Sequence, residues 1–174
     1  MVKASLSQQN AENTSFYDDL FDHVNCQGVI HHTPDAEATV REIARILKPN
    51  GTASISVYYR IIFLRSWRFI RCIGWLLSFF GAKLKGRGRE NIFKQSNVDE
   101  IVRLYDGSQN PIGKSYSKKS FIDLLSTYFE IEETYLHFFP ARALPFGISR
   151  TLHRFFDKRF CFMIYATLRK KCVE

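Results

Sequence analysis

A strand, a helix and a second strand follow one another closely in the first third of the chain, and this order constrains the fold most. Residues 21–27 (FDHVNCQ) and 52–59 (TASISVYY) have the composition of strands. Between them apolar residues recur at helical spacing, with Thr33 as the predicted N-cap, Pro34 as the first helical residue and Pro49-Asn50-Gly51 as the stop. The short connections predict a βαβ unit, and therefore a parallel pair of strands with a right-handed crossover.

The carboxyl ends of these two strands predict a ligand site, because open α/β sheets bind ligands outside those ends. His31 and His32 follow directly after the first end. We expect one of them to face the cleft. It could act there as a general base, or the pair could be structural at the helix entry. We expect no metal ligation, because adjacent residues on a helix diverge and the sequence offers no third ligand at useful spacing.

The second half of the chain predicts a helix and a closing hairpin. Residues 106–116 have the composition of a loop, and Ser117 is a good N-cap for a helix over about 118–128. Residues 130–138 and 160–168 predict two strands, and residues 147–157 predict a short helix between them. Two late strands of this kind favour an antiparallel pair.

Residues 61–95 form a basic and aromatic segment after the second strand. Residues 60–95 contain nine basic residues and one acidic residue, and the whole chain has a net charge of +8. Arg65, Arg68 and Arg71 are spaced by three, which places them on one edge of a helix and disfavours a membrane span. Three interpretations stay open: a helical insertion that packs on the domain, a helix on a membrane surface, and an RNA-binding arm. The last lacks an aromatic stacking motif, so nucleic acid is the least favoured partner.

The length and the cysteines limit the class of protein. A chain of 174 residues suits one domain. The four cysteines are far apart in the sequence, which predicts reduced thiols in a cytoplasmic protein, with membrane association as an alternative raised by the basic segment. The first twenty residues have no apolar stretch typical of a secretory signal.

Four motifs, in this order and at this spacing, resemble the class I SAM-dependent methyltransferases of the small-molecule group called methyltransferase type 11. They are Asn10-Ala11-Glu12, Phe21-Asp22-His23-Val24, the helix entry from Gly28 to Asp35, and Leu47 to Gly51. The later stretch NPIGKSYSKKSFIDLLSTYFEI also resembles the C-terminal part of that group. The resemblance implies an α/β fold with a partial Rossmann-like sheet, mostly parallel, with a C-terminal antiparallel hairpin.

The resemblance also implies roles for individual residues. S-adenosyl-L-methionine (SAM) would be the cofactor, and a small molecule of lipophilic or anionic character would accept the methyl group. The segment 61–95 would be an insertion, and it lies where a lid over the acceptor would be. The implied catalytic residues are His31 and His32; the cofactor-binding residues are Asn10, Ala11, Gln27, Gly28 and His32; the substrate residues are Tyr58, Arg60 and Tyr116.

One motif of the group is missing. The sequence contains no Gly-x-Gly-x-x-Gly, which the group places before the region of Asn10. We therefore expect residues 1–174 to be a single truncated domain, the C-terminal part of a methyltransferase. The strand at 21–27 would then have an unpaired edge, through which the chain could form a homodimer. The alternative is a non-catalytic module that binds a membrane surface or a partner through residues 61–95.

Overall fold

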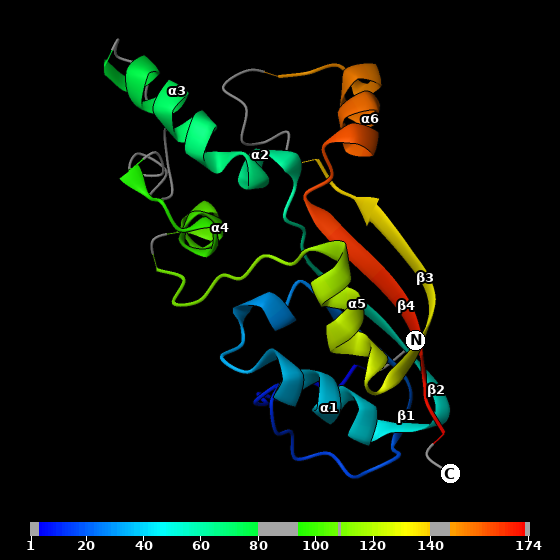
Figure 1. Cartoon of the computed structure of the whole chain (residues 1–174). Coiled ribbons are helices and arrows are strands. Elements are labelled where there is room, and N and C mark those ends of the chain that lie inside the picture. Colours follow the sequence, from blue (N-terminus) through cyan, green and yellow to red (C-terminus); the bar gives the residue numbers. More distant parts are fainter. Residues whose placement is uncertain (1–3, 80–93, 108, 140–146, 173–174) are drawn as a thin grey trace.

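The structure, a computed structural model, describes residues 4–79, 94–107, 109–139 and 147–172 (Figure 1). Strands and helices alternate along the chain, which confirms the predicted α/β class. In order, the elements are β1 (Phe21–Gln27), the 3-10 turn η1 (Ile30–His32), α1 (Ala36–Ile46), β2 (Leu47–Tyr58), α2 (Ile62–Arg65), α3 (Trp67–Phe79), α4 (Val98–Asp106), α5 (Lys118–Ser126), β3 (Phe129–His137), α6 (Arg150–Arg159) and β4 (Met163–Lys170).

The four strands form one sheet in the order β1-β2-β4-β3. β1 and β2 are parallel, with Cys26 opposite Ile55, which confirms the predicted βαβ unit. β4 is antiparallel to both β2 and β3, which confirms the closing hairpin. The described sheet thus has one parallel and two antiparallel pairs, fewer parallel pairs than the predicted mostly parallel sheet. Among the described residues β1 pairs only with β2, so its other edge is unpaired. The homodimer through this edge stays a prediction.

The second strand starts earlier than the sequence predicts. β2 begins at Leu47, directly after α1, and Pro49-Asn50-Gly51 lies inside it. Leu47 pairs with Phe21, and the next pair along β1 is His23 with Thr52, so β2 advances five residues while β1 advances two. Asn50 has a φ of 61°, a conformation that asparagine tolerates better than most residues. The predicted helix stop is therefore a bulge within the strand.

The helix between these strands also begins later than predicted. Thr33 is not its N-cap, because the Thr33 hydroxyl donates to the Ile30 carbonyl at 2.8 Å and Thr33 closes the η1 turn. Asp35 caps α1 instead, and its carboxylate accepts a 3.0 Å hydrogen bond from the Ala38 amide. Thr33 thus closes η1, and Asp35 begins α1.

One face of the sheet carries the main core. α1 and α5 lie side by side on that face (Figure 1), and their apolar residues meet those of the strands. On the opposite face Ser54 pairs with Thr167, and Thr52 pairs with Arg169, so that face is largely polar. The fully buried apolar side chains of the core include Ile30, Val40, Leu47, Ile55, Val57, Phe121, Leu125, Phe129, Ile164 and Leu168.

A second, smaller core holds α2, α3 and α4 together beyond the carboxyl end of β2 (Figure 1). α4 was not predicted, although Asn97 caps it and Asp99 and Glu100 occupy its first turn. Several described apolar side chains of α3 are exposed, and Phe69 and Phe79 are 77% and 79% exposed. The part of the predicted insertion from residue 80 to residue 93 lies outside the described residues. The members of this second core are Leu64, Trp67, Ile101, Val102 and Leu104.

The remaining elements lie within a few residues of their predicted positions. Ser117 caps α5 as expected, with a reciprocal hydrogen bond to Ser120. α6 ends at Arg159, two residues later than predicted, and β4 consequently begins at Met163. No described helix has the length and the apolar character that a membrane crossing requires.

Candidate functional site

The turn after β1 places both histidines beyond the carboxyl ends of the parallel strands. Gly28 has a φ of +75°, and its amide donates to the carbonyl and the hydroxyl of Ser56, both at 3.1 Å. This turn leads directly into η1, so His31 and His32 lie beside the end of β2. Glycine adopts this left-handed backbone conformation without the strain that a Cβ would introduce.

His31 is enclosed in an aromatic stack. Its side chain is 1% exposed, and its ring centroid lies 4.2 Å from that of His32 and 4.0 Å from that of Tyr58. Burial, with a smaller effect from the neighbouring His32, lowers the pKa of His31 to about 3. Its imidazole is therefore neutral at neutral pH and is a weak base. The nitrogen Nδ1 of His31 is buried and has no hydrogen-bond partner.

His32 is half-buried and is oriented by a backbone carbonyl. Its Nδ1 lies 2.8 Å from the carbonyl oxygen of Ile112 and 3.1 Å from the side-chain nitrogen Nδ2 of Asn110. A carbonyl can only accept, so Nδ1 donates to Ile112. Nε2 then points to Asp106, with 3.3 Å between Nε2 and Oδ2.

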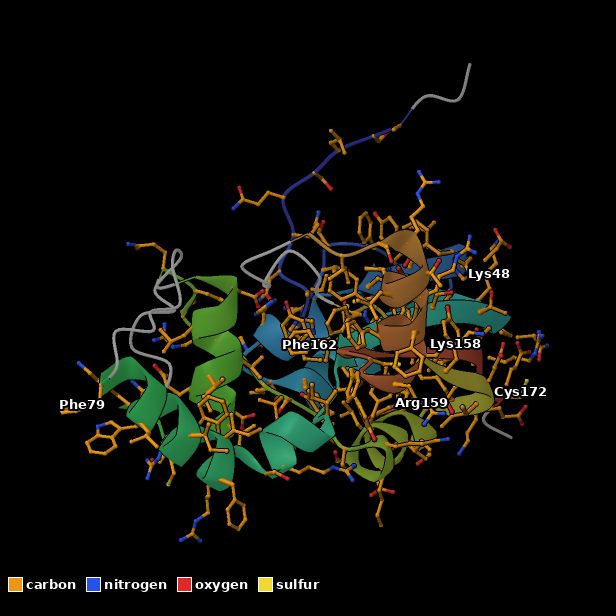
Figure 2. The ribbon with its side chains drawn as sticks, turned by 90° about the horizontal axis from the view of Figure 1, so that it is seen from above. Lys48, Phe79, Lys158, Arg159, Phe162 and Cys172 are labelled. Carbon is orange, nitrogen blue, oxygen red and sulfur yellow. The ribbon has the colours of Figure 1, made fainter. Side chains whose placement is uncertain are left out.

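Asp106 completes this group from a distant part of the sequence. Its Oδ1 accepts a 2.5 Å hydrogen bond from the hydroxyl of Tyr58, whose ring also packs against Phe162 at 4.8 Å. Phe162 lies near the middle of the molecule in Figure 2. The other oxygen, Oδ2, is buried and lies within ion-pair distance of His32 without a hydrogen bond. Asp106 was predicted as the first residue of a loop and not as a site residue, although a helix ending before Gly107 could have located it.

The loop from residue 109 to residue 117 is hydrogen-bonded to η1 and to the residues that follow it. The Lys114 amide donates to the carbonyl of His31 at 3.0 Å. The Lys114 ammonium donates to the carbonyls of Thr33 and Pro34, at 3.1 Å and 2.7 Å. These bonds hold the loop against both histidines, so the site is built from two halves of the chain.

The three predicted substrate residues come together at the end of β2. The Tyr116 amide donates to the carbonyl of Tyr58, and the Arg60 amide donates to the carbonyl of Tyr116, each at 2.8 Å. The guanidinium of Arg60 contacts Ser115 and lies 3.5 Å from Asp99. Burial raises the pKa of the Tyr116 phenol to about 12. Arg60 and Tyr116 therefore support the local structure, whereas Tyr58 contacts the histidines.

The predicted cofactor residues lie in two segments, one in the turn at Asn10 and one at the end of β1 and in η1. Asn10 and Ala11 belong to a turn in which the Asn10 side chain accepts from the Glu12 amide at 3.1 Å. The Glu12 carboxylate accepts from the Asp35 amide at 2.7 Å, which holds this turn at the start of α1. Gln27 is exposed at the end of β1.

A pocket of about 420 Å³ opens on the other side of the β2 end, between α2, β3 and α6. Apolar and aromatic side chains line it, including Tyr59 and Phe155, and Arg65 lies among them. Lys158 and Arg159 belong to α6 and also line it (Figure 2). Such a lining suits an apolar small molecule that carries negative charge.

Comparison with known proteins shows a resemblance over the first third of the chain. Residues 2–55 match the family model described as a methyltransferase domain. The predicted resemblance to the methyltransferases is confirmed. Within this methyltransferase-like chain, the matched residues extend from the N-terminus to the middle of β2 and include the turn at Asn10, β1, both histidines and α1.

Two curated methyltransferases are similar to parts of the chain. The uncharacterized methyltransferase YcgJ of Bacillus subtilis is 40% identical over 52 residues, which are 30% of this chain and 21% of the relative. A ubiquinone biosynthesis O-methyltransferase of Pectobacterium atrosepticum is 25% identical over 116 residues, which are 64% of this chain and 43% of the relative. The matches thus span less than half the length of either relative.

A solved structure shows the same fold over almost the whole chain. It is a SAM-dependent methyltransferase of Methanosarcina mazei, with a TM-score of 0.59 and 18% sequence identity. The similarity covers 99% of this chain and 69% of that protein. At this identity the likeness concerns the fold, and it confirms the Rossmann-like methyltransferase sheet.

Proposed function

We propose that this chain supplies part of the cleft of a SAM-dependent methyltransferase that acts on a small molecule. The observation that carries the proposal is the group of His31, His32, Tyr58 and Asp106 beyond the carboxyl ends of β1 and β2, within a chain that matches the methyltransferase domain. Because the sequence contains no Gly-x-Gly-x-x-Gly, we propose that a polypeptide segment outside residues 1–174 completes the cofactor site.

The residues at the end of β1 fit the proposed cofactor. A Cβ added to Gly28 would meet no atom within 4 Å, so the backbone there is open to close approach by a ligand. The exposed amides of Asn10 and Gln27 can each both donate and accept, as an adenine edge or a ribose hydroxyl requires. The hydrogen bond from the Asp35 amide to Glu12 keeps the turn at Asn10 close to η1.

When bound, SAM supplies an activated methyl group, and the protein mainly orients the reactants and excludes water. In our proposal Tyr58 and His31 form the closed wall of the cleft, because His31 is 1% exposed and stacked on Tyr58. His32 is the residue proposed to take a proton from an acceptor, because its Nδ1 donates to Ile112, which leaves the lone pair on Nε2, and its side chain is 28% exposed.

We further propose a lipophilic, anionic acceptor. The pocket beside Tyr59 combines aromatic walls with the cations Arg65, Lys158 and Arg159. It begins one residue after Tyr58, and α2 borders it, which supports the interpretation of α2 and α3 as a cover over the acceptor.

Calorimetric titration of the purified chain with SAM and with S-adenosylhomocysteine tests the proposal. We expect saturable binding of both, and at least fivefold weaker binding by Asn10→Ala, because that substitution removes the amide proposed to contact the cofactor. Asn13→Ala is the matched control, since Asn13 is exposed in the same turn and only its backbone takes part in the turn's bridge. Equal binding by both variants would contradict the role of Asn10, and absent binding would contradict the expectation that this part of the cleft holds SAM without the rest of the site.

A second candidate function is supported by α3. Its exposed side chains include Phe69, Ile73, Leu76 and Phe79, and it carries Arg68 and Arg71. Phe79 lies at the outer end of the molecule in Figure 2. Exposed aromatic residues beside arginines are typical of helices that lie on anionic membranes.

Co-sedimentation with vesicles that contain phosphatidylserine tests this second function. We expect Arg68→Glu combined with Arg71→Glu to abolish binding. Arg65 is unsuitable for the test, because its guanidinium donates to the Arg60 carbonyl and the Tyr59 hydroxyl. The control is Arg150→Glu with Arg154→Glu, which changes the charge of the exposed helix α6 by the same amount. Equal loss in both double variants would indicate only a general charge effect.

A further inference from the structure

We propose that His31, His32 and Asp106 form a binding site for a divalent first-row transition-metal ion such as Zn²⁺. Each of the three side chains offers one ligand atom, and these atoms all lie within 4.8 Å of one another. Methyl transfer as proposed above requires no metal, and the site can be tested without SAM. An ion on Nε2 of His32 would occupy the lone pair assigned above to proton transfer, so His32 would serve as a base only in the metal-free chain.

The first support is a set of electron pairs that lack hydrogen-bond partners. Nδ1 of His31 and Oδ2 of Asp106 are the buried side-chain nitrogen or oxygen atoms without a hydrogen bond in the part of the chain that the structure describes. Both belong to the same cluster. A buried polar atom without a partner costs about 1–3 kcal/mol, so two in one cluster indicate a missing positive partner.

The second support is the orientation of His32. Its Nδ1 donates to the Ile112 carbonyl, which leaves the lone pair of Nε2 directed toward Oδ2 of Asp106 at 3.3 Å. Two lone pairs at this distance repel, and a cation between them removes the repulsion. Metal-binding histidines generally donate their other ring nitrogen to a carbonyl in this way, which fixes the tautomer.

The carboxylate is also held in place. Oδ1 of Asp106 accepts a 2.5 Å hydrogen bond from Tyr58, so Oδ2 is left for an ion. The side chains of His32 and Asp106 are 28% and 24% exposed, which gives an ion access to the otherwise buried cluster. The supporting bonds come from Tyr58 at the end of β2 and from Ile112 in the loop at 109–117.

The structure also removes the two reasons for expecting no metal ligation, which were diverging side chains and the lack of a third ligand. His31 and His32 lie in a 3-10 turn, and their ring centroids are 4.2 Å apart instead of diverging. The third ligand comes from the end of α4, at a sequence distance that no local motif reveals.

The ligand set indicates the class of ion. Two imidazoles and one carboxylate suit Zn²⁺, Co²⁺ or Fe²⁺ better than Mg²⁺ or Ca²⁺, which prefer oxygen ligands. Metal–ligand bonds of about 2.0–2.2 Å require tetrahedral ligand atoms to approach to about 3.5 Å, so binding would draw the three side chains together. Three protein ligands would leave one position for water or a substrate oxygen.

Titration with Co²⁺ tests the site, because tetrahedral Co²⁺ absorbs visible light. The chain carries Cys72→Ser and Cys172→Ser, since these two exposed thiols could also bind the ion. After treatment with a chelator, we expect one Co²⁺ per chain, displaced by Zn²⁺. Asp106→Asn should weaken binding at least tenfold, because the amide keeps an acceptor for Tyr58 but loses the charge.

Asp157→Asn is the matched control. Asp157 lies 2.8 Å from Nδ1 of His137, so the control also removes a carboxylate beside a histidine, but outside the cluster. It should bind Co²⁺ as the parent chain does. Circular dichroism of each variant without metal verifies that it is folded.

NMR of the histidine rings provides a second measurement on the unsubstituted chain. Zn²⁺ should shift the ring resonances of His31 and His32 and leave those of His137 and His153 unchanged. The proposal is overturned if no saturable binding occurs, if Asp106→Asn binds as well as Asp157→Asn, or if the shifts occur at the other histidines.

Discussion

Tyr58, the last residue of β2, donates a 2.5 Å hydrogen bond to Asp106, the last residue of α4, across 48 positions of the sequence. This bond connects the central sheet to the smaller core of α2, α3 and α4. The same pair also forms one side of the histidine cluster, because the Tyr58 ring stacks on His31 and the Asp106 carboxylate faces His32. Local stability and the candidate site therefore depend on the same contact.

Tyr58→Phe should destabilise the chain. Removal of the hydroxyl leaves Asp106 without its donor, and a hydrogen bond to a charged group contributes about 1.5–3 kcal/mol. We expect the free energy of unfolding in urea to fall by about that amount, and the amides of α4 to exchange faster. Tyr135→Phe is the control, since the half-exposed Tyr135 ring stacks on Tyr165 and its hydroxyl has no hydrogen bond among the described residues. Equal effects of the two substitutions would contradict this account.

Gly113→Ala should weaken the packing of the loop at 109–117 against α4. A Cβ at Gly113 would lie 2.6 Å from both the Cα and the nitrogen of Arg103, which belong to the backbone and cannot rotate away. Overpacking of this kind costs about 1–3 kcal/mol. We expect a lower melting temperature and faster amide exchange at Lys114. Gly147→Ala should be neutral, because a Cβ there meets nothing within 4 Å; a similar loss in both variants would show that the close approach is not the cause.

Glu42 should make stability depend on acid pH. Its nearly buried carboxylate accepts hydrogen bonds from Arg45 and from the amide and hydroxyl of Thr14, and these lower its pKa from 4.5 to about 2. A lowered pKa means that the carboxylate stabilises the fold above its unfolded pKa. That stability, about 3 kcal/mol at most, is lost as the pH falls from about 4.5 toward 2.

Unfolding of Glu42→Gln in urea between pH 7 and pH 3 measures this contribution. The variant should be less stable at pH 7 and should lose less stability on acidification. Glu37→Gln is the control, because Glu37 lies exposed on the same helix. If Glu42→Gln and the parent chain have parallel pH profiles, the carboxylate of Glu42 is not the group responsible.

The four cysteines should divide into two pairs by reactivity. Cys72 and Cys172 are exposed, whereas Cys26 and Cys161 are buried. Burial raises the pKa of Cys26 to about 11 and also raises that of Cys161, so little thiolate forms at neutral pH. A thiol-reactive disulfide reagent should label two thiols quickly in the native chain and all four in urea. Rapid labelling of Cys26 without denaturant would contradict the position of β1 in the sheet.

The sequence predicted those elements whose signals are local. The βαβ unit followed from the strand composition on either side of an amphipathic helix, and Ser117 capped α5 as its neighbours indicated. The wrong N-cap had a local cause as well. Both Thr33 and Asp35 are good caps. Their order along the chain does not tell which of them closes the η1 turn and which begins α1.

The sequence by itself determined the parallel strands, the closing hairpin and the position of the histidines after a strand end, because each depends on neighbouring residues. Only the tertiary structure decided that Asp106 meets His31 and His32 and that Tyr58 holds it there. It likewise decided that Arg60 and Tyr116 support the loop. The physical reason is that side chains distant in sequence meet only where the sheet and the second core pack together, and no periodicity records that packing.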